Sequence, residues 1–362
     1  MVKSAKYLLI GSTEAYSGKS ATILGVAHQL QAKGLDIAYG KPLGTHTNTN
    51  QPDATEEDVR FMMEVLNLPE PRVLPPLLFL DTETIQKRLQ GEDSTNYHQS
   101  LKQYIQQRDG DLILLEGPGT LSEGSLFNLS LQEVAQTLEA PVLLVARFHS
   151  VLLVESLLSA KQYLGEYLLG VLINDIPTDQ LSMVESTLRP FLEQQGIPVL
   201  GMWPRSQLLR SVSVRELVKQ LHAEVLCRSD RLDLMVETLT IGAMNVSAAL
   251  KYFRKRSNMA VVTGGDRTDI QMAALETSTH CLILTGHLPP PDFVLHRAEE
   301  LEIPVLSVDL DTLSTVEIID HAFGQVRLHE PIKVQCIQQM MNQHFDIERL
   351  ISQLGLEPAV TA

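Results

Sequence analysis

Short apolar runs rich in branched residues alternate with longer amphipathic stretches, and this alternation most constrains the fold. The runs are continuous, which is typical of strands covered by helices on both faces. In the first half we expect strands at residues 7–10, 37–39, 112–115, 141–145, 168–173 and 198–202. We expect helices between them at 20–33, 58–66, 131–138, 151–164 and 180–195. This order predicts an α/β fold with a doubly wound, mainly parallel sheet.

A second strand–helix series follows a change of pattern at residues 205–225. The expected strands are 259–262, 281–284, 304–308 and a short one at 326–328. The expected helices are 213–222, 239–253, 268–275, 291–301 and 315–321, and residues 332–356 read as a helical tail. Asn245 is a predicted helix cap. At roughly 100–200 residues per domain, a chain of 362 residues fits two or three domains. We predict domains at 1–205 and 206–335, with a tail at 336–362.

The charge balance excludes several classes of function. With 29 Lys+Arg and 44 Asp+Glu the net charge is −15, which argues against binding nucleic acid or an anionic membrane. No apolar run approaches the ~18 residues of a membrane helix, and the first apolar run is too short for a signal peptide. The 3 cysteines are scattered without a CxxC pair, as in reduced proteins. We therefore expect a cytoplasmic protein.

A glycine-containing loop joins the first predicted strand to the first predicted helix and ends in Gly18-Lys19-Ser20. Such loops bind phosphate because backbone N–H groups and the helix N-terminus converge on the anion, while Lys adds charge and Ser reaches magnesium. Thr13 stands where the usual spacing has glycine, which indicates a variant loop; the alternative is an ordinary turn with a surface lysine. We predict nucleotide contacts from Thr13, Ser17, Gly18, Lys19, Ser20 and Ala21.

Acidic residues follow two of these strands and are candidate magnesium ligands beside Ser20. Glu116 stands at the C-terminal tip of the strand at 112–115, at the edge where ligands bind in open α/β sheets. Four acidic residues follow the second strand: Asp53, Glu56, Glu57 and Asp58. The alternatives are a solvated turn for Glu116 and, for the acidic run, a helix start favoured by its dipole.

Three more strand ends carry side chains suited to a nucleotide site. Lys41, before Pro42, could hold an anionic substrate group, or it is a surface lysine. The amide of Asn174 can both donate to and accept from an adenine edge, or it forms a turn with Asp175. Trp203 either flanks the base or packs in the core.

The second half contains a glycine pair before a predicted helix, in the order Thr263-Gly264-Gly265-Asp266-Arg267. Two glycines there open a backbone nest that suits an anion, with Asp266 as a cap and Arg267 as a charge clamp. Alternatively the glycines only permit a tight turn, and Asp266 and Arg267 form an internal ion pair that fixes the fold or a dimer interface.

On these motifs, about residues 5–205 resemble the dethiobiotin synthetase-like branch of P-loop proteins. That branch includes cobyrinate amidating enzymes and the N-terminal domain of long bacterial phosphotransacetylases. The resemblance implies a phosphate loop ending in GK[ST], a Lys-Pro pair, two acidic magnesium ligands and a base-recognising Asn. In this sequence these are Gly18-Lys19-Ser20, Lys41-Pro42, Asp58 with Glu116, and Asn174.

The second half looks like a DRTGG domain, a small regulatory module. The similarity rests on the stretches Val262–Ile270, Leu284-Thr285-Gly286 and Asp309-Leu310-Asp311-Thr312. It makes Thr263 to Arg267, Thr285 and Gly286 a candidate ligand site or interface. The domain pair resembles the N-terminal two-thirds of long phosphotransacetylases. The chain ends at Ala362, before the acyl-transferring domain that the resemblance implies, so we expect no phosphate acetyltransferase activity.

Three functions fit these observations. The first is a regulatory or sensor protein that binds ATP and Mg²⁺, and whose second domain binds a partner protein, a small effector or its own copy in a dimer. The second is an ATP-dependent ligase, in which ATP phosphorylates a carboxylate or carbamate and Lys19 and Lys41 are catalytic. The third is a structural or interaction module with a degenerate P-loop, as Thr13 allows.

Overall fold

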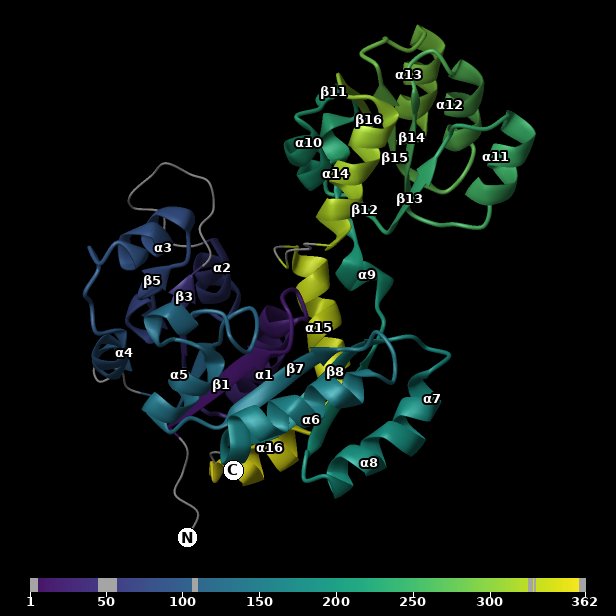
Figure 1. Cartoon of the computed structure of the whole chain (residues 1–362). Helices are drawn as coiled ribbons and strands as arrows, with labels where there is room; N and C mark the ends of the chain where they lie inside the picture. The colour runs from purple at the N-terminus through teal and green to yellow at the C-terminus, as the bar shows by residue number, and fades with distance from the viewer. Residues whose placement is uncertain (1–5, 45–56, 106–109, 325–327, 329, 358–362) are drawn as a thin grey trace. The chain divides into compact units, whose positions relative to one another are not determined.

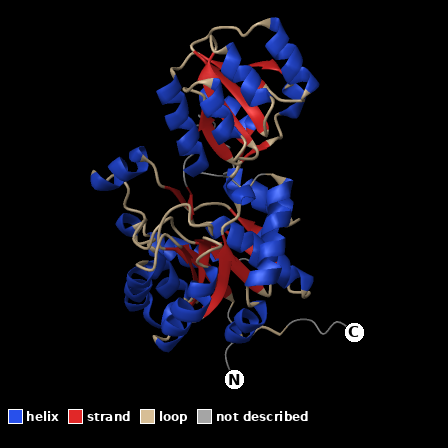
Figure 2. Ribbon diagram, turned by 90° about the vertical axis from the view of Figure 1, so that its right-hand side faces the viewer, coloured by secondary structure: helices blue, strands red, loops and turns tan. Residues whose placement is uncertain are grey.

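The computed structural model describes residues 6–44, 57–105, 110–324, 328 and 330–357 (Figure 1). The chain forms two compact units, one of residues 1–205 with 328–362 and one of residues 206–327. In each unit helices enclose the strands of a sheet (Figure 2). The predicted α/β class, with a mainly parallel sheet and a smaller second α/β unit, is confirmed.

The first unit is built on a parallel seven-stranded sheet in the order β4-β2-β6-β1-β7-β8-β9. Its central strands are almost wholly buried, in agreement with their continuous apolar sequence. The strands are β1 (Tyr7–Ser12), β2 (Ile37–Gly40), β4 (Val73–Leu74), β6 (Leu112–Glu116), β7 (Val142–Arg147), β8 (Leu168–Ile176) and β9 (Val199–Pro204). Six of these were predicted; β4 was missed because two residues carry no periodic signal. A small parallel pair, β3 (Leu43–Gly44) and β5 (Leu78–Phe79), lies outside the main sheet.

The helices of this unit largely follow the amphipathic stretches. The predicted ones are α1 (Lys19–Ala32), α2 (Glu57–Val65), α5 (Leu131–Leu138) and α6 (Leu153–Leu164), and the unpredicted ones are α3 (Thr82–Leu89) and α4 (Tyr97–Ile105). The single helix predicted at 180–195 is interrupted. It consists of α7 (Leu181–Met183), a π-helical stretch (Val184–Leu188) and α8 (Arg189–Gln194). Pro190 explains the interruption because it has no N–H for the regular helix ladder.

The C-terminal segment belongs to the first unit, whereas the sequence predicted a separate tail from residue 336. Helices α15 (Pro331–His344) and α16 (Ile347–Leu354) lie against α1 and β9 (Figure 1). Gly25 of α1 permits the close approach, since a Cβ there would lie 2.5 Å from the Cε of Met341. Arg349 donates to both carboxylate oxygens of Glu193, at 2.7 and 2.9 Å.

The second unit contains a five-stranded sheet in the order β11-β16-β15-β14-β13. Only β11 runs antiparallel to its neighbour. The strands are β11 (Glu224–Cys227), β13 (Thr238–Ile241), β14 (Met259–Gly264), β15 (Thr279–Thr285) and β16 (Val305–Val308). The sequence predicted only the last three of these. A short antiparallel pair, β10 (Val212–Ser213) and β12 (Met235–Val236), completes the strands described.

The helices of the second unit are α9 (Gln207–Arg210), α10 (Val214–Leu221), α11 (Val246–Phe253), α12 (Thr268–Leu275), α13 (Asp292–Glu300) and α14 (Thr312–Gly324). The helix predicted at 239–253 was wrong at its start, because Leu239–Ile241 pairs with β14 as part of β13. The prediction that Asn245 caps this helix is confirmed, because its side chain accepts a hydrogen bond from the N–H of Ala248 at 2.9 Å. Residues 326 and 327 of the strand predicted at 326–328 lie outside the described residues.

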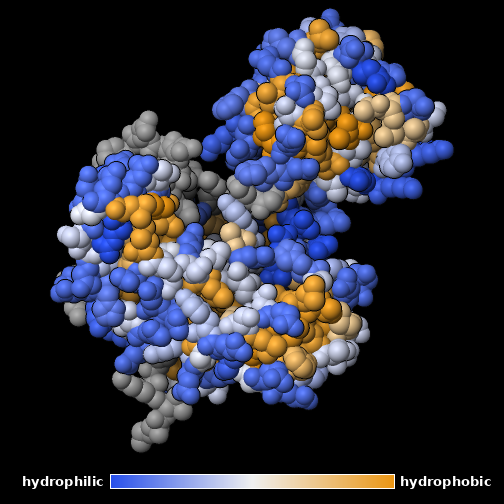
Figure 3. All heavy atoms as spheres, viewed as in Figure 1, coloured by the Kyte–Doolittle hydropathy of each residue, from blue (hydrophilic) through white to orange (hydrophobic). Residues whose placement is uncertain are grey.

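Apolar side chains reach the surface of both units (Figure 3). Among the large apolar side chains in the described ranges, Leu89, Leu152 and Leu313 are the most exposed, at 70%, 72% and 68%, and they lie in three different segments. No helix in the described ranges is long and apolar enough to cross a bilayer.

Candidate nucleotide site

The phosphate loop connects the end of β1 to the start of α1, as the sequence predicts. Gly18 is the residue before the helix and has φ 104°, a backbone conformation that glycine adopts without strain. It also lies against β8, since a Cβ on Gly18 would be 2.4 Å from the Nδ2 of Asn174. The loop therefore needs glycine at this point for both its conformation and its contact.

Lys19 points back toward the strand it follows. Its Nζ donates to the Oγ of Ser12 at 3.1 Å, and Ser12 in turn donates to the carbonyl of Gly119 at 2.9 Å. Burial lowers the pKa of Lys19 below its usual 10.5, and the charges of Glu116 and Glu123 oppose that shift. A partly buried cation at the start of a helix suits an anionic ligand, which would further favour the charged form.

Ser20 and Glu116 are brought together across the base of the loop. The Oγ of Ser20 donates to Oε1 of Glu116 at 3.2 Å, and the hydroxyl of Tyr39 donates to Oε2 at 2.8 Å. Tyr39 is fully buried and Glu116 is 5% exposed. Hydroxyl and carboxylate oxygens are the hard donors that magnesium prefers, with nucleotide phosphates completing its shell. The donor set therefore fits magnesium.

A second charged pair lies on the same side of the loop. Nζ of Lys41, which is 5% exposed, lies 3.1 Å from Oδ2 of Asp58. Both charges act on the pKa of Lys19, Lys41 lowering it and Asp58 raising it, so both residues lie near the loop. Asp53 and Glu56 lie outside the described residues. The described residues contain no group of three or more His, Cys, Asp or Glu arranged to hold a metal.

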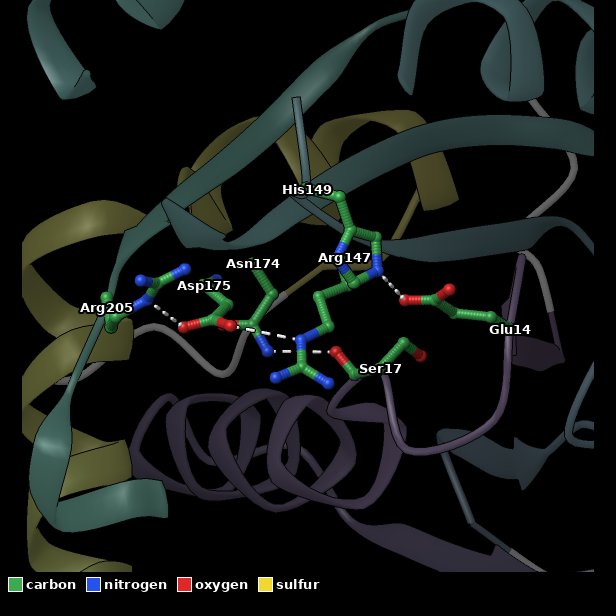
Figure 4. A network of polar contacts seen from close by, with 7 residues as sticks. All are labelled: Glu14, Ser17, Arg147, His149, Asn174, Asp175 and Arg205. Atoms are coloured by element: carbon green, nitrogen blue, oxygen red, sulfur yellow. Dashed lines mark hydrogen bonds and ion pairs between the residues drawn. The ribbon is translucent and has the colours of Figure 1, made fainter. Parts of the chain in front are cut away.

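The amide of Asn174 is bonded to the loop itself. Nδ2 donates to the carbonyl of Ser17 at 2.8 Å, and Oδ1 accepts from the N–H of Asp175 at 2.8 Å (Figure 4). Asn174 therefore fixes the loop, and recognition of a base by it stays a prediction. Ser17 is buried and its Oγ has no hydrogen-bond partner among the described residues. Trp203 is fully buried, in agreement with the packing alternative.

The sequence analysis missed an arginine pair at the ends of β7 and β9. Nε of Arg147 lies 3.0 Å from Oδ2 of Asp175, and Nε of Arg205 lies 2.9 Å from Oδ1 (Figure 4). A signal was present, because each arginine directly follows a buried apolar run, like Glu116 and Lys41. On the same edge, His149 lies 2.7 Å from a carboxylate oxygen of Glu14 in the loop.

In the second unit, the glycine pair joins β14 to α12. The N–H of Gly265 donates to the carbonyl of Thr285 at 3.1 Å. Arg267 pairs with Asp269 at 3.4 Å and donates to the carbonyl of Met244 at 2.9 Å, so its ion pair is with Asp269 rather than Asp266. The hydroxyl of Thr263 donates to the carbonyl of Gly242 at 3.0 Å. These contacts give the turn a structural role, and a ligand there stays a prediction.

Gln271, which the sequence analysis did not single out, closes the same turn. Its Nε2 donates to the carbonyls of Gly264 and Gly265, both at 3.0 Å. Gly286 has φ 83° and open space around the position of a Cβ.

Comparison with known families identifies the two units. The model of a family described as AAA domain matches residues 6–213, more than half of the chain. The chain belongs to this AAA domain family. The DRTGG domain model matches residues 216–322, so the AAA domain is followed by a DRTGG domain, and the resemblance seen in the sequence is confirmed.

Relatives of the AAA–DRTGG chain include phosphate acetyltransferases. One from Synechocystis sp. is 25% identical over 370 residues, covering 96% of this chain and 51% of the relative. One from Nitratidesulfovibrio vulgaris is 26% identical over 376 residues, with coverage of 96% and 51%. The chain thus spans about half the length of the curated relatives it matches. Among solved structures, the septum site-determining protein MinD complexed with Mg-ADP from Pyrococcus horikoshii OT3 matches 57% of this chain and 83% of its own, at 16% identity and a TM-score of 0.35.

Proposed function

We propose that this P-loop and DRTGG protein binds ATP with Mg²⁺ in its first unit and acts as a regulatory or sensor protein. The proposal rests on one observation: the Lys19 ammonium and the Ser20–Glu116 pair both lie at the loop that leads into α1. Lys19 and the N–H groups of the loop would hold the phosphates. Bound magnesium would neutralise phosphate charge, with Ser20 and Glu116 as its protein ligands and Asp58 nearby.

The net charge of −15 makes these local features necessary. An acidic protein repels nucleotides at long range, so binding depends on Lys19, on the helix N-terminus and on the metal. We propose that the second unit carries the response, by binding an effector or partner or by forming a dimer. The described cysteines Cys227, Cys281 and Cys336 form no disulfide, which supports a cytoplasmic location.

A carboxylate-activating ligase is the second candidate, and Lys41 favours it. The ammonium of Lys41 is nearly buried, pairs with Asp58 and lies close enough to influence Lys19. A cation there would stabilise a carboxylate or carbamate that attacks the terminal phosphate. Phosphate release that depends on an added carboxylate, and that is lost in Lys41→Ala, would favour this candidate over the sensor.

Calorimetric titration with ATP, with and without Mg²⁺, tests nucleotide binding. We expect Mg²⁺-dependent binding that Lys19→Ala abolishes. Lys87→Ala is the control, because Lys87 is exposed and pairs only locally with Glu83. Absence of ATP binding by the natural sequence would contradict the sensor and the ligase together and leave the structural module.

A further inference from the structure

Arg147, Asp175 and Arg205 form a cluster on the carboxyl edge of the first sheet, beside the phosphate loop (Figure 4). Each arginine binds the Asp175 carboxylate through Nε alone. Their remaining guanidinium N–H groups make no hydrogen bond or ion pair with the described residues. A guanidinium has five N–H donors in a fixed fork, so most donors of Arg147 and Arg205 have no partner among the described residues.

The cluster carries an excess of one positive charge, from two guanidiniums and one carboxylate. Asp175 is 8% exposed, so the charges meet at the margin of the interior, where they are screened less than in open water. Glu14, the loop carboxylate on this edge, is paired with His149 rather than with the arginines. Arg147 is partly buried and Arg205 is exposed. Excess positive charge with N–H donors turned to solvent suits an anion, and phosphate matches the guanidinium fork.

The backbone holds the cluster rigidly and links it to the phosphate loop. Asp175 has φ 61°, and its N–H is bonded to Asn174, whose Nδ2 binds the carbonyl of Ser17. The N–H of Arg205 donates to the carbonyl of Ile176 at 2.7 Å. These bonds tie the backbone at Asp175 and Arg205 to the phosphate loop, and each guanidinium is placed by its ion pair with Asp175.

Sheet order shows which end of a nucleotide the cluster faces. Glu116 ends β6 and Lys41 follows β2, on one side of β1, whereas the cluster lies at the carboxyl ends of β7, β8 and β9, on the other side. If Glu116 binds magnesium, as proposed above, the terminal phosphate and the metal lie on the Glu116 side. The nucleoside end of the same ligand then extends toward the arginines.

We propose that Arg147 and Arg205, held together by Asp175, bind an additional phosphate at the nucleoside end of the nucleotide. The ligand class is a nucleotide phosphorylated on its ribose as well as at its 5′ end. This inference rests on the proposed nucleotide site and adds selectivity to it. ATP or ADP would bind through the phosphate loop, and the ribose phosphate would supply the extra affinity.

The subsite formed by Arg147 and Arg205 can be tested by calorimetry with three ligands. These are ADP, ADP carrying a 2′-phosphate and ADP carrying a 3′-phosphate. Because hydrogen bonds between charged groups are strong, we expect one ribose-phosphorylated form to bind about 10- to 100-fold more tightly than ADP. Arg147→Gln and Arg205→Gln should each reduce that preference at least several-fold and leave ADP affinity nearly unchanged. Arg147→Lys should keep part of it, because charge remains but the fork is lost.

Arg72→Gln is the matched control. It removes the same charge from the first unit, but Arg72 pairs with Asp36, which precedes β2 at the opposite edge of the sheet. The control should keep the full preference. Equal affinity of the natural sequence for ADP and both phosphorylated forms overturns the subsite alone, as does an equal loss of all three ligands in the arginine variants. Failure to bind any of the three overturns the proposed nucleotide site as well.

Discussion

At the phosphate loop, the residue type that a position requires depends on its contacts as much as on its place in a motif. Gly18 fits the general pattern of such loops, but here it also makes room for the amide of Asn174. Glu116 is held by Ser20 on one oxygen and by Tyr39 on the other. The positions of Gly18 and Glu116 in the sequence predict that they belong to the site. Tyr39 carries no such signal, because it lies within an apolar strand.

Gly18→Ala should destabilise the first unit by more than backbone strain alone and should weaken ATP binding. The left-handed φ costs an alanine about 1 kcal/mol, and the new Cβ must also displace Asn174. Gly91→Ala separates the two effects, because Gly91 has φ 78° and open space around the position of a Cβ. The measurement is the free energy of unfolding by urea. An equal loss in the two variants would show that the Asn174 contact is unimportant.

Helices and strands can be predicted from the sequence where their apolar pattern extends over enough residues. Helix α5 coincides with its predicted range, whereas the stretch 239–253 divides into β13 and α11. Thr238–Ile241 favours a strand through its branched residues, but four residues are too few to show alternation. Its pairing partner β14 lies beyond α11, outside any short sequence window, and that pairing decides the outcome.

Asn245→Ala should cost about 1 kcal/mol of stability in the second unit, the usual value of a lost N-cap. The reason is that the N–H of Ala248, at the start of α11, loses its bond to the Asn245 side chain. Gln220→Ala serves as the control, since Gln220 is exposed and bonds only to Glu216 one turn earlier. Thermal unfolding of the two variants measures the difference. A loss as small as that of the control would exclude a stabilising cap.

On the scale of the whole molecule, the last two helices return to complete the first unit. Met341 of α15 is fully buried beside Gly25 of α1, and Gln29 donates to the side chain of Asn342 at 2.8 Å. The amphipathic pattern at 332–356 predicts helices, and both are present. The same pattern does not say which domain receives their apolar faces.

Met341→Ala should destabilise the first unit by about 2–5 kcal/mol, the usual cost of truncating a buried Met. Hydrogen exchange resolved by segment should show faster exchange in α1 and β1, with the second unit unchanged. Gln339→Ala, an exposed position on the same helix, is the matched control. Unchanged exchange in α1 would mean that the C-terminal helices do not support the first unit.

The sequence by itself determined the α/β class, the approximate division near residue 205, the loop before α1 and the polar residues at strand ends. These are local properties, since apolar runs, loop glycines and caps act over a few residues. Tertiary structure decided which strand ends meet. It placed Asp175 between Arg147 and Arg205, put Tyr39 on Glu116 and returned α15 to α1. Such contacts depend on strand order and packing, which join residues far apart in the chain and leave no periodic trace in it.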